Sequence, residues 1–169
     1  MITNFNLYEI DSFFDKKKLN KKPEFLYHLT SGENFNKIIK NGLSVKSSIY
    51  HQFVQGIYLT DSMYIASTYK FEKENCHIIE IHFNKLNSRY MKPDDWELFQ
   101  IIDDDWEDIK EYFDIFRMNE RDKQIIWETL DYRHSLYICE QLIYTRNIPS
   151  NLFSNVYDEI EIEKMLNLK

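Results

Sequence analysis

"GIYLTDSMYIASTY" occupies residues 56–69 and changes its hydrophobic pattern halfway along. Its first half, GIYLT, has the composition of a strand, and SMYIASTY has the spacing of a helix with Thr60 or Asp61 as its N-cap. Tyr58 and Tyr69 stand on either side of this strand-to-helix turn, eleven positions apart. Core packing would explain both tyrosines, and two rings that flank a flat aromatic ligand are the alternative.

The chain before this turn predicts another strand followed by a helix. EFLYHLT has strand composition and ends at Thr30, and TSGENFNKIIKNGL has helical spacing. Thr30 and Glu33 have the spacing of a capping box, and Asn41-Gly42 supplies a left-handed stop. The positions of this helix expected to face the core are Phe35, Ile38 and Ile39.

Three later stretches complete the expected order of elements. CHIIEIHF alternates like a strand, SLYICEQLIYTRNIP predicts a long strand that is apolar on both faces, and YDEIEIEKMLNLK predicts a terminal helix. Glu140 falls near the middle of the predicted long strand, where the pattern favours an apolar residue. Strands, then helices, then a strand again predict an α+β fold and not a doubly wound parallel sheet.

The composition predicts one globular domain. The chain has 169 residues and a hydrophobic content of 43%, so we expect a single domain over 1–169. The sequence contains no stretch of the ~20 apolar residues that a membrane span needs, and its start lacks the apolar core of a secretory signal peptide. Cys76 and Cys139 are the only cysteines. These features predict a cytoplasmic protein with no disulfide and no membrane partner.

The net charge of −7 is concentrated in one segment. Residues 92–131 hold fourteen acids against five bases, so the rest of the chain is slightly basic, with lysines clustered over 16–22. This distribution argues against a uniformly basic nucleic-acid binder. The acidic segment is expected to form a helix with one apolar stripe, followed by a second helix over 124–130. The stripe consists of Ile102, Trp106, Ile109, Phe113 and Phe116.

Glu140 and His28 are the first candidates for chemistry. Burying a carboxylate is costly unless it is paired, so a Glu inside an apolar strand points to function, whereas an edge strand would simply expose it. His28 ends a strand before a helix, a place where a structural histidine is also common. His77 and His82 are expected on opposite faces of their strand and Cys76 completes no zinc spacing, so no metal is expected.

Three blocks of the sequence, read in order, resemble a known family. LYHLTSGENFNKIIKNGL, GIYLTDSMYIASTY and LYICEQLIYTRNIPSNL are similar to the blocks of the poly(ADP-ribose) polymerase-like ADP-ribosyltransferases, a group shared with diphtheria-type toxins. That family carries a His-Tyr-Glu triad on three strands of a split antiparallel sheet with peripheral helices. The resemblance covers about 25–153, and the acidic segment 92–131 is an insertion without a counterpart.

The resemblance implies a role for each matching position. His28, Tyr58 and Glu140 match the triad, in which the His binds the adenine-side ribose of NAD and the Glu is catalytic. Tyr58 and Tyr69 match the two tyrosines on either side of the nicotinamide ring. NAD is then the substrate, and no metal is implied. The other positions matched to the NAD site are Leu29, Thr30, Asn34 and Ser67.

Three positions depart from the family pattern. Leu29 stands where many relatives have Gly, and Ala66 stands where relatives often have Ser, with Ser67 next to it. Relatives that modify arginine have an acidic residue or Gln two positions before the catalytic Glu, and here that position is Ile138. This departure argues against an arginine acceptor.

The activity implied by the resemblance is mono-ADP-ribosyl transfer from NAD to a macromolecular acceptor, either protein or nucleic acid. A bacterial or phage toxin or defence effector, with an antitoxin as partner, is the biological role implied. Two alternatives stay open on the same scaffold: an inactive nucleotide-binding module, and an NAD glycohydrolase or RNA 2′-phosphotransferase. The chain has few arginines and none near the first two blocks, which argues against the phosphotransferase.

Overall fold

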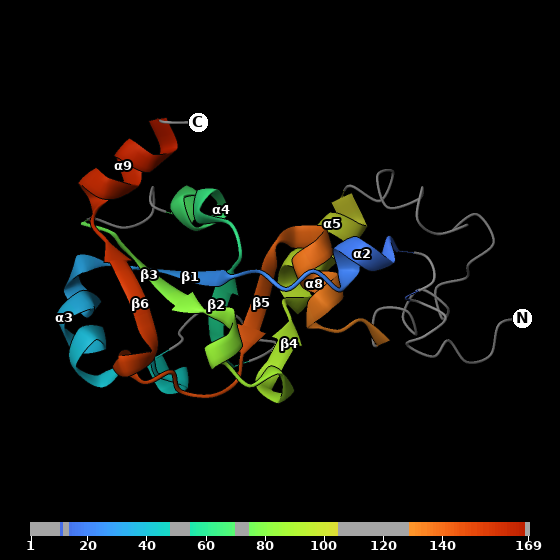
Figure 1. The fold of residues 1–169 in the computed structure, drawn as a ribbon, viewed down its shortest axis with the longest axis horizontal. Helices are drawn as coiled ribbons and strands as arrows, with labels where there is room; N and C mark the ends of the chain where they lie inside the picture. Colours follow the sequence, from blue (N-terminus) through green and yellow to red (C-terminus); the bar gives the residue numbers. More distant parts are fainter. Residues whose placement is uncertain (1–10, 12–13, 48–54, 70–74, 105–128, 168–169) are drawn as a thin grey trace, which may run out of the picture.

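The computed structural model describes residues 11, 14–47, 55–69, 75–104 and 129–167. Their fold is α+β, as the order of elements predicts, and six strands form one antiparallel sheet in the order β4-β5-β2-β1-β3-β6 (Figure 1). The strands are β1 (Phe25–Thr30), β2 (Ile57–Thr60), β3 (His77–His82), β4 (Met91–Pro93), β5 (Gln141–Tyr144) and β6 (Phe153–Tyr157). The α-helices with bounds in these ranges are α2 (Lys16–Leu19), α3 (Gly32–Asn41), α4 (Met63–Thr68), α5 (Asp95–Asp104), α8 (Tyr132–Cys139) and α9 (Glu159–Asn167).

The sheet is narrowest at the join between β1 and β2. β1 pairs with β3 at six positions and β2 pairs with β5 at four, but the described pairing of β1 with β2 is one position, Tyr27 with Thr60. Figure 1 shows β1 and β2 running in different directions, with β3 and β6 beside β1 and with β5 and β4 beyond β2. The sheet therefore consists of two three-stranded halves that diverge from a short join.

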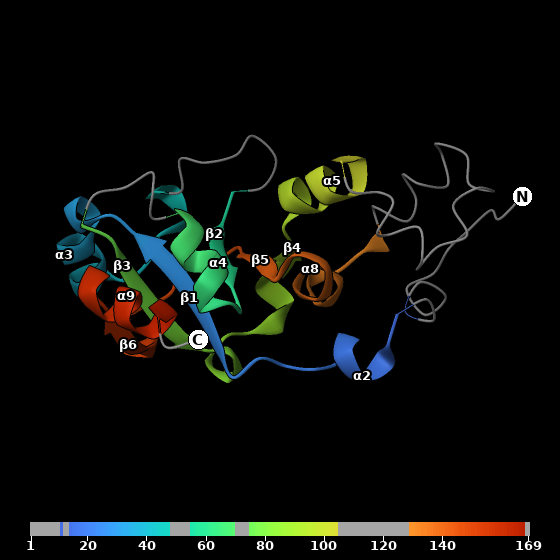
Figure 2. The ribbon, with the colours of Figure 1, turned by 90° about the horizontal axis from the view of Figure 1, so that it is seen from above.

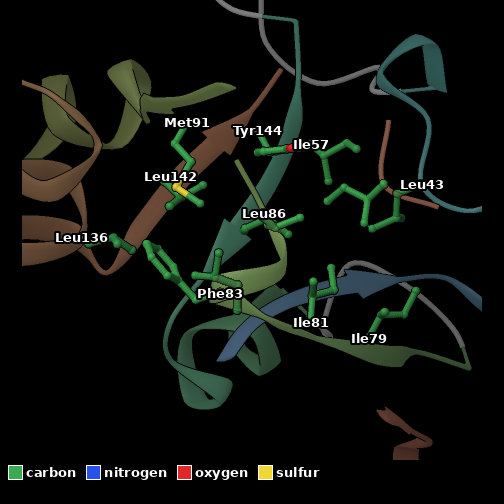
Figure 3. Close-up of a cluster of buried hydrophobic side chains, with 13 residues drawn as sticks. Leu43, Ile57, Ile79, Ile81, Phe83, Leu86, Met91, Leu136, Leu142 and Tyr144 are labelled. Carbon is green, nitrogen blue, oxygen red and sulfur yellow. The ribbon is translucent and has the colours of Figure 1, made fainter. Parts of the chain in front are cut away.

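One hydrophobic core connects the two halves. Alternate side chains of each half point to the same face of the sheet, and Figure 3 shows them gathered around Leu86. Full burial of one such aliphatic side chain stabilises the fold by about 1.5–3 kcal/mol. The buried strand residues of this core include Leu26, Ile79 and Ile81 from one half and Ile57, Leu59 and Leu142 from the other.

A second cluster attaches helices to the opposite face. Leu29 and Ile78 of the sheet pack with Ala66 of α4 and Ile162 of α9, and all four side chains are buried. Figures 1 and 2 show α4 and α9 near one another over the half of the sheet that contains β1 and β3. This face therefore lies under two helices, and α4 is the helix that follows β2 directly.

Two glycines stand where a side chain would not fit. Gly42 ends α3 with φ 81°, as the Asn41-Gly42 pair predicts, and an added Cβ would lie 2.3 Å from the carbonyl oxygen of Ile148. At Gly56 an added Cβ would lie 2.1 Å from Cγ2 of Ile143. Gly56 thus permits the close approach of β2 to β5.

The strand predicted over 135–149 is confirmed only over Gln141–Tyr144, and the rest of that prediction is wrong. Residues 135–139 belong to α8, and the strand β5 begins at Gln141. Asp131 starts this helix, because its carboxylate accepts from the backbone N–H of Arg133 while the His134 ring accepts from the Asp131 N–H. A short apolar run fits a buried strand and a buried helix equally well, so the capping residues upstream decided between them.

The start of α3 also differs from its prediction. The N-cap is Ser31 and no side chain caps the helix, so the capping box expected at Thr30 and Glu33 is wrong. Thr30 instead completes β1, where it is paired with His77. Thr30 therefore belongs to the strand, although the local pattern assigned it to the start of the helix.

The buried face of α3 is narrower than predicted. Phe35 stacks on His77 with ring centroids 3.8 Å apart, and Ile38 packs against the main core. Ile39 is 39% exposed, so the prediction that it is buried is wrong. A helix at the end of a sheet contacts its neighbours along one narrow stripe, and Ile39 lies outside that stripe.

The acidic segment 92–131 is described in part. α5 confirms a helix over Asp95–Asp104, and the edge strand β4, which the sequence did not predict, lies just before it. Of the second predicted helix, only Thr129 and Leu130 belong to the described residues. The stripe positions that lie outside the described residues are Trp106, Ile109, Phe113 and Phe116.

Candidate functional site

The candidate site lies where α8 ends and β5 begins. Glu140 is the C-cap of α8 with φ 58° and ψ 21°, the left-handed region that favours Gly or Asn. Its side chain is exposed, which corrects the expectation of a carboxylate inside an apolar strand. Among the described residues, Asn75 is the other non-glycine residue with a positive φ. A strained carboxylate at the negative end of a helix is locally unfavourable, and strained residues cluster at functional sites.

Asp61 lies opposite Glu140 at the adjoining end of β2. Its backbone N–H donates to the carbonyl oxygen of Glu140 at 3.1 Å, one step beyond the paired residues Thr60 and Gln141. Burial raises the pKa of the Asp61 carboxyl to about 6, with a further contribution from the negative charge of Glu140, and Lys21 offsets a part of this rise. The end of β2 and the start of β5 therefore hold two carboxylates of like charge.

The two carboxylates line two hollows of the surface. A pocket of about 410 Å³ lies between β1, α4 and α9, and Tyr27 and Tyr64 line it together with Asp61 and Glu140. A groove of about 890 Å³ lies toward α2 and α8 and shares Tyr27, Asp61 and Glu140 with the pocket. Glu140 is therefore accessible from both sides. The basic residues that line the groove are Lys18, Lys21, Lys22 and Arg133.

His28 lies in the region where β1 and β2 diverge. Its Nδ1 donates to the carbonyl oxygen of Tyr58 at 2.9 Å, since a carbonyl oxygen can only accept. The strand register places the His28 side chain on the face that carries Leu59 and Ile79, and it places the Tyr58 side chain on the opposite face. The structure therefore brings the His28 imidazole to the backbone of Tyr58 and not to its ring.

Tyr58 and Tyr69 approach the same face of β2 and β5. Tyr58 is paired with Ile143, and the Tyr69 hydroxyl donates to Oε1 of Glu97 at 3.1 Å and accepts from Nε2 of Gln141 at 3.2 Å. Gln141 is two positions from Ile143, so its side chain points to the face of Tyr58. Burial raises the pKa of both tyrosines to about 12, and nearby carboxylates contribute, so both hydroxyls are neutral at physiological pH.

The remaining positions matched to NAD lie along β1 and on the helices that follow β1 and β2. Thr30 is buried at the end of β1, and Asn34 is exposed in the first turn of α3. Leu29 is buried under α4, and the hydroxyl of Ser67 donates to the carbonyl oxygen of Tyr64 at 2.6 Å. Thr30 and Asn34 are therefore separated from Glu140 by the length of β1.

Besides these groups, the described residues include two cysteines. Cys76 and Cys139 are both free and buried, and burial raises the pKa of the Cys139 thiol to about 12, so no thiolate nucleophile is available there. Within the described residues, no group of three or more His, Cys, Asp or Glu side chains is placed to hold a metal ion. No helix in the same ranges is long and apolar enough to cross a membrane.

The sequence did not identify Asp61 and Gln141 as site residues. Asp61 was expected to cap α4, but Ser62 is the N-cap and accepts from the backbone N–H of Ile65 at 3.3 Å. Gln141 was one polar residue in an apolar run. The register between β2 and β5 places Asp61 beside Glu140, and no local sequence signal specifies that register.

Comparison of the sequence with protein-family models and with curated proteins finds no match. The geometry at the α8–β5 junction, together with the resemblance of the three sequence blocks, therefore carries the functional argument. The arrangement offers an exposed carboxylate, a second carboxylate beside it, and two tyrosines on an adjoining surface. These groups can bind a planar ring and stabilise a developing positive charge.

Proposed function

We propose that this protein is an NAD-dependent mono-ADP-ribosyltransferase in which Glu140 is the catalytic carboxylate. The observation that carries the proposal is the placement of Glu140. Its side chain is exposed, its backbone is in the left-handed region, and it lies at the C-terminal end of a helix. None of these features stabilises the fold, so we infer that Glu140 is retained for chemistry. The strand β5, which begins at the next residue, adjoins β2, which carries Tyr58, and β2 adjoins β1, which carries His28.

An extended dinucleotide suits the layout of residues along β1. Tyr27 shares the pocket with Glu140, and Thr30 lies three residues further along the strand, roughly 10 Å away at ~3.3 Å per residue. His28 lies between them along the strand, and its hydrogen bond to Tyr58 fixes the orientation of its ring. The side chains of His28 and Thr30 point to the face of β1 opposite to that of Tyr27, so NAD would contact β1 from both faces in this arrangement. In the proposal, the nicotinamide end of NAD lies beside Glu140, and the adenosine end lies toward Thr30 and Asn34.

The surface that carries Tyr58 and Tyr69 suits the nicotinamide ring. A planar cationic ring is attracted to the faces of aromatic side chains. Carboxylates surround the two tyrosines, because Tyr69 donates to Glu97 and the charge of Asp94 acts on Tyr58. The nicotinamide ring is positively charged only in the oxidised dinucleotide, so we expect preference for NAD over its reduced form.

Glu140 would act on the ribose next to the nicotinamide. Cleavage of the bond between the ring nitrogen and C1′ develops oxocarbenium character on the ribose, as in glycoside hydrolysis. A carboxylate that accepts a hydrogen bond from the adjacent 2′-hydroxyl stabilises this charge more strongly as it grows. Nicotinamide leaves as a neutral molecule, and C1′ forms a new bond to the acceptor. The exposed position of Glu140 between two hollows leaves room for both substrates.

The biological part of the proposal rests on the resemblance of the three sequence blocks. An enzyme that modifies a cellular macromolecule with ADP-ribose would act as a bacterial or phage toxin or defence effector in the cytoplasm. An antitoxin protein would be its natural partner. Arginine is the least favoured acceptor, because Ile138 stands two positions before Glu140.

The test is release of nicotinamide from NAD by the purified protein, with and without cell lysate, followed by chromatography. Isotope-labelled NAD added to the lysate reveals whether the label moves to protein or to nucleic acid. We expect Glu140→Gln to lower the rate of release by about 10²–10³, the scale for removal of one preorganised stabilising group.

Glu33→Gln is the matched control, since Glu33 is an exposed residue in the first turn of α3, away from the pocket and the groove. This control is expected to keep the wild-type rate. Undiminished release by Glu140→Gln would disprove the role of the carboxylate. Binding of NAD without any release would leave the inactive nucleotide-binding module as the function. Release of free ADP-ribose without a labelled acceptor would identify a glycohydrolase.

A further inference from the structure

Asp61 is an unpaired carboxylate within the candidate site. It lines both the pocket and the groove with Glu140, and their backbones are joined by the hydrogen bond from Asp61 N to Glu140 O at 3.1 Å. Capping of α4 does not use it, because Ser62 fills that role. In the part of the chain that the structure describes, no side-chain hydrogen bond or ion pair to the Asp61 carboxylate is present. Its own backbone N–H and the charge of Lys21 act on this carboxylate, but none of the described side chains holds it by a hydrogen bond or an ion pair.

We propose that Asp61 is the general base of the transfer step and takes the proton from the acceptor as the acceptor attacks C1′ of the ribose. This inference rests on the proposed function and assigns the second carboxylate of the same site. Glu140 stabilises the charge on the ribose, whereas Asp61 faces the groove through which an acceptor reaches Glu140. Two carboxylates at the same place thus divide two tasks between them.

The step balances in bonds and protons. The electron pair of the C1′–nitrogen bond leaves with nicotinamide, and a lone pair of the acceptor forms the new bond to C1′. The acceptor atom becomes positively charged unless it loses its proton, and Asp61 receives that proton and later returns it to water. No oxidant, reductant or metal takes part in this sequence.

The two carboxylates also restrict the class of acceptor. An acceptor that is itself a carboxylate or a phosphate needs no base, and it would be repelled by Asp61 and Glu140 together. A neutral nucleophile that carries a proton, such as a hydroxyl or an amide-type nitrogen, needs a base and is not repelled. The structure therefore favours a proton-bearing oxygen or nitrogen acceptor, whether protein, nucleic acid or water supplies it.

The charge environment of Asp61 suits a base that works near neutral pH. Burial and the negative charge of Glu140 raise the pKa of Asp61 to about 6, so the carboxylate is ionised at pH 7 and still accepts a proton readily. Lys21 is the cation that acts on it, and it opposes this rise. The titratable and charged groups of the other elements around the two hollows are Glu24, Tyr27, Tyr64, Tyr132, Arg133, Tyr137 and Glu140, with Lys18 and Lys22 beside Lys21.

The experiment compares Asp61→Asn with the wild type at several pH values, with and without azide. Azide is an anionic nucleophile that needs no deprotonation. We expect the variant to release nicotinamide about 10²-fold more slowly with water or lysate as acceptor, within the range for loss of a general base. Azide is expected to restore release in Asp61→Asn and to form ADP-ribosyl azide, which also shows that the variant is folded. Azide is expected not to restore Glu140→Gln, which lacks the stabilising carboxylate.

The pH profile supplies the second readout. The rate of nicotinamide release by the wild type is expected to fall below an apparent pKa near 6. The rate of Asp61→Asn is expected not to show this fall at acidic pH. Asp158→Asn is the matched control, since Asn also caps the N-terminus of α9 and Asp158 lies outside both hollows. A wild-type rate and profile in Asp61→Asn would overturn the assignment of Asp61 alone. Absence of release by the wild type would overturn the proposed function with it.

Discussion

Each end of helix α8 carries an acidic side chain, and the surroundings of the two side chains differ. At the N-terminal end, Asp131 accepts from the backbone N–H of Arg133 at 2.8 Å and from its Nε at 2.9 Å. His134 is fully buried and contacts Asp131, and Arg133 continues the network to Asp11. Burial alone would raise the pKa of Asp131, but the adjacent His134 ring and hydrogen bonds from the side chain and backbone of Arg133 outweigh it and lower the pKa to about 2.

At the C-terminal end of the same helix, Glu140 has none of these advantages. It adopts a left-handed backbone, it lies at the negative end of the helix dipole, and its charge acts on another carboxylate, that of Asp61. Burial together with Glu140 raises the pKa of Asp61 to about 6. The contacts at the N-terminal end of α8 therefore stabilise the fold. The like charges at the C-terminal end oppose folding, and such charges are common at catalytic sites.

The largest expected effect on stability is at the N-terminal end. Asp131→Ala removes the helix cap and leaves Arg133 and His134 without their carboxylate, so we expect a loss of about 2–3 kcal/mol in the free energy of unfolding. Urea unfolding followed by circular dichroism measures this loss. The control is Asp15→Ala, because Asp15 caps the exposed helix α2 through backbone N–H groups and has no buried partner among the described contacts. Equal losses in the two variants would show that the network adds nothing beyond capping.

A gain in stability is expected at the C-terminal end. Glu140→Gly removes the strain of a left-handed glutamate and the repulsion of Asp61, so we expect about 1 kcal/mol of added stability together with loss of nicotinamide release. Melting temperature and release are measured on the same preparation. Asn75→Gly is the matched control, since Asn75 has φ 50° and Asn tolerates this region better than Glu. A less stable Glu140→Gly would show that Glu140 supports the fold.

The smallest expected effect is a difference in pH dependence between the two ends. The pKa of Asp131 lies below its usual 3.8, so its stabilising contribution is complete above about pH 4 and is lost as the pH falls through about 2. The pKa of Asp61 lies above 3.8, so its ionised form destabilises the fold above about pH 6, and this penalty disappears below about pH 4.

Asp61→Asn is therefore expected to melt at a higher temperature than the wild type at pH 7 and at the same temperature at pH 4. Because Asp61 is partly exposed and water screens its charge, the gain at pH 7 is about 1 kcal/mol or less. Asp131→Asn is expected to be less stable than the wild type at pH 7, with a difference that shrinks toward pH 2. A gain of Asp61→Asn that is equal at pH 4 and pH 7 would contradict the charge effect.

Much of the fold was predictable from local patterns. Alternation and β-branched residues predicted β1, β2 and β3, and helical spacing predicted α3, α4 and α9. The error at 135–149 arose because an apolar run of that length has no period that separates helix from strand. Asp131 and His134 have the spacing of a capping box in the sequence. This pair could be recognised as a helix start only from the structure, in which His134 is buried.

The candidate site was predictable only as a set of residues. His28, Tyr58, Tyr69 and Glu140 were selected from sequence blocks. The side chains of His28 and Tyr58 point to opposite faces of the sheet, and of the four residues Glu140 alone lines the pocket and the groove. Asp61 could not be selected, because its local signal is that of a helix cap. Its spatial neighbour Glu140 lies 79 positions later in the sequence.

The sequence by itself determined the elements, since hydrophobic period, capping residues and glycines act within a few positions of one another. It also determined where charge accumulates along the chain. The tertiary structure decided that β5 lies against β2 in a register that joins Asp61 to Glu140. Pairing between distant strands depends on the whole sheet, because a shift of one residue would turn every side chain of the strand to the other face.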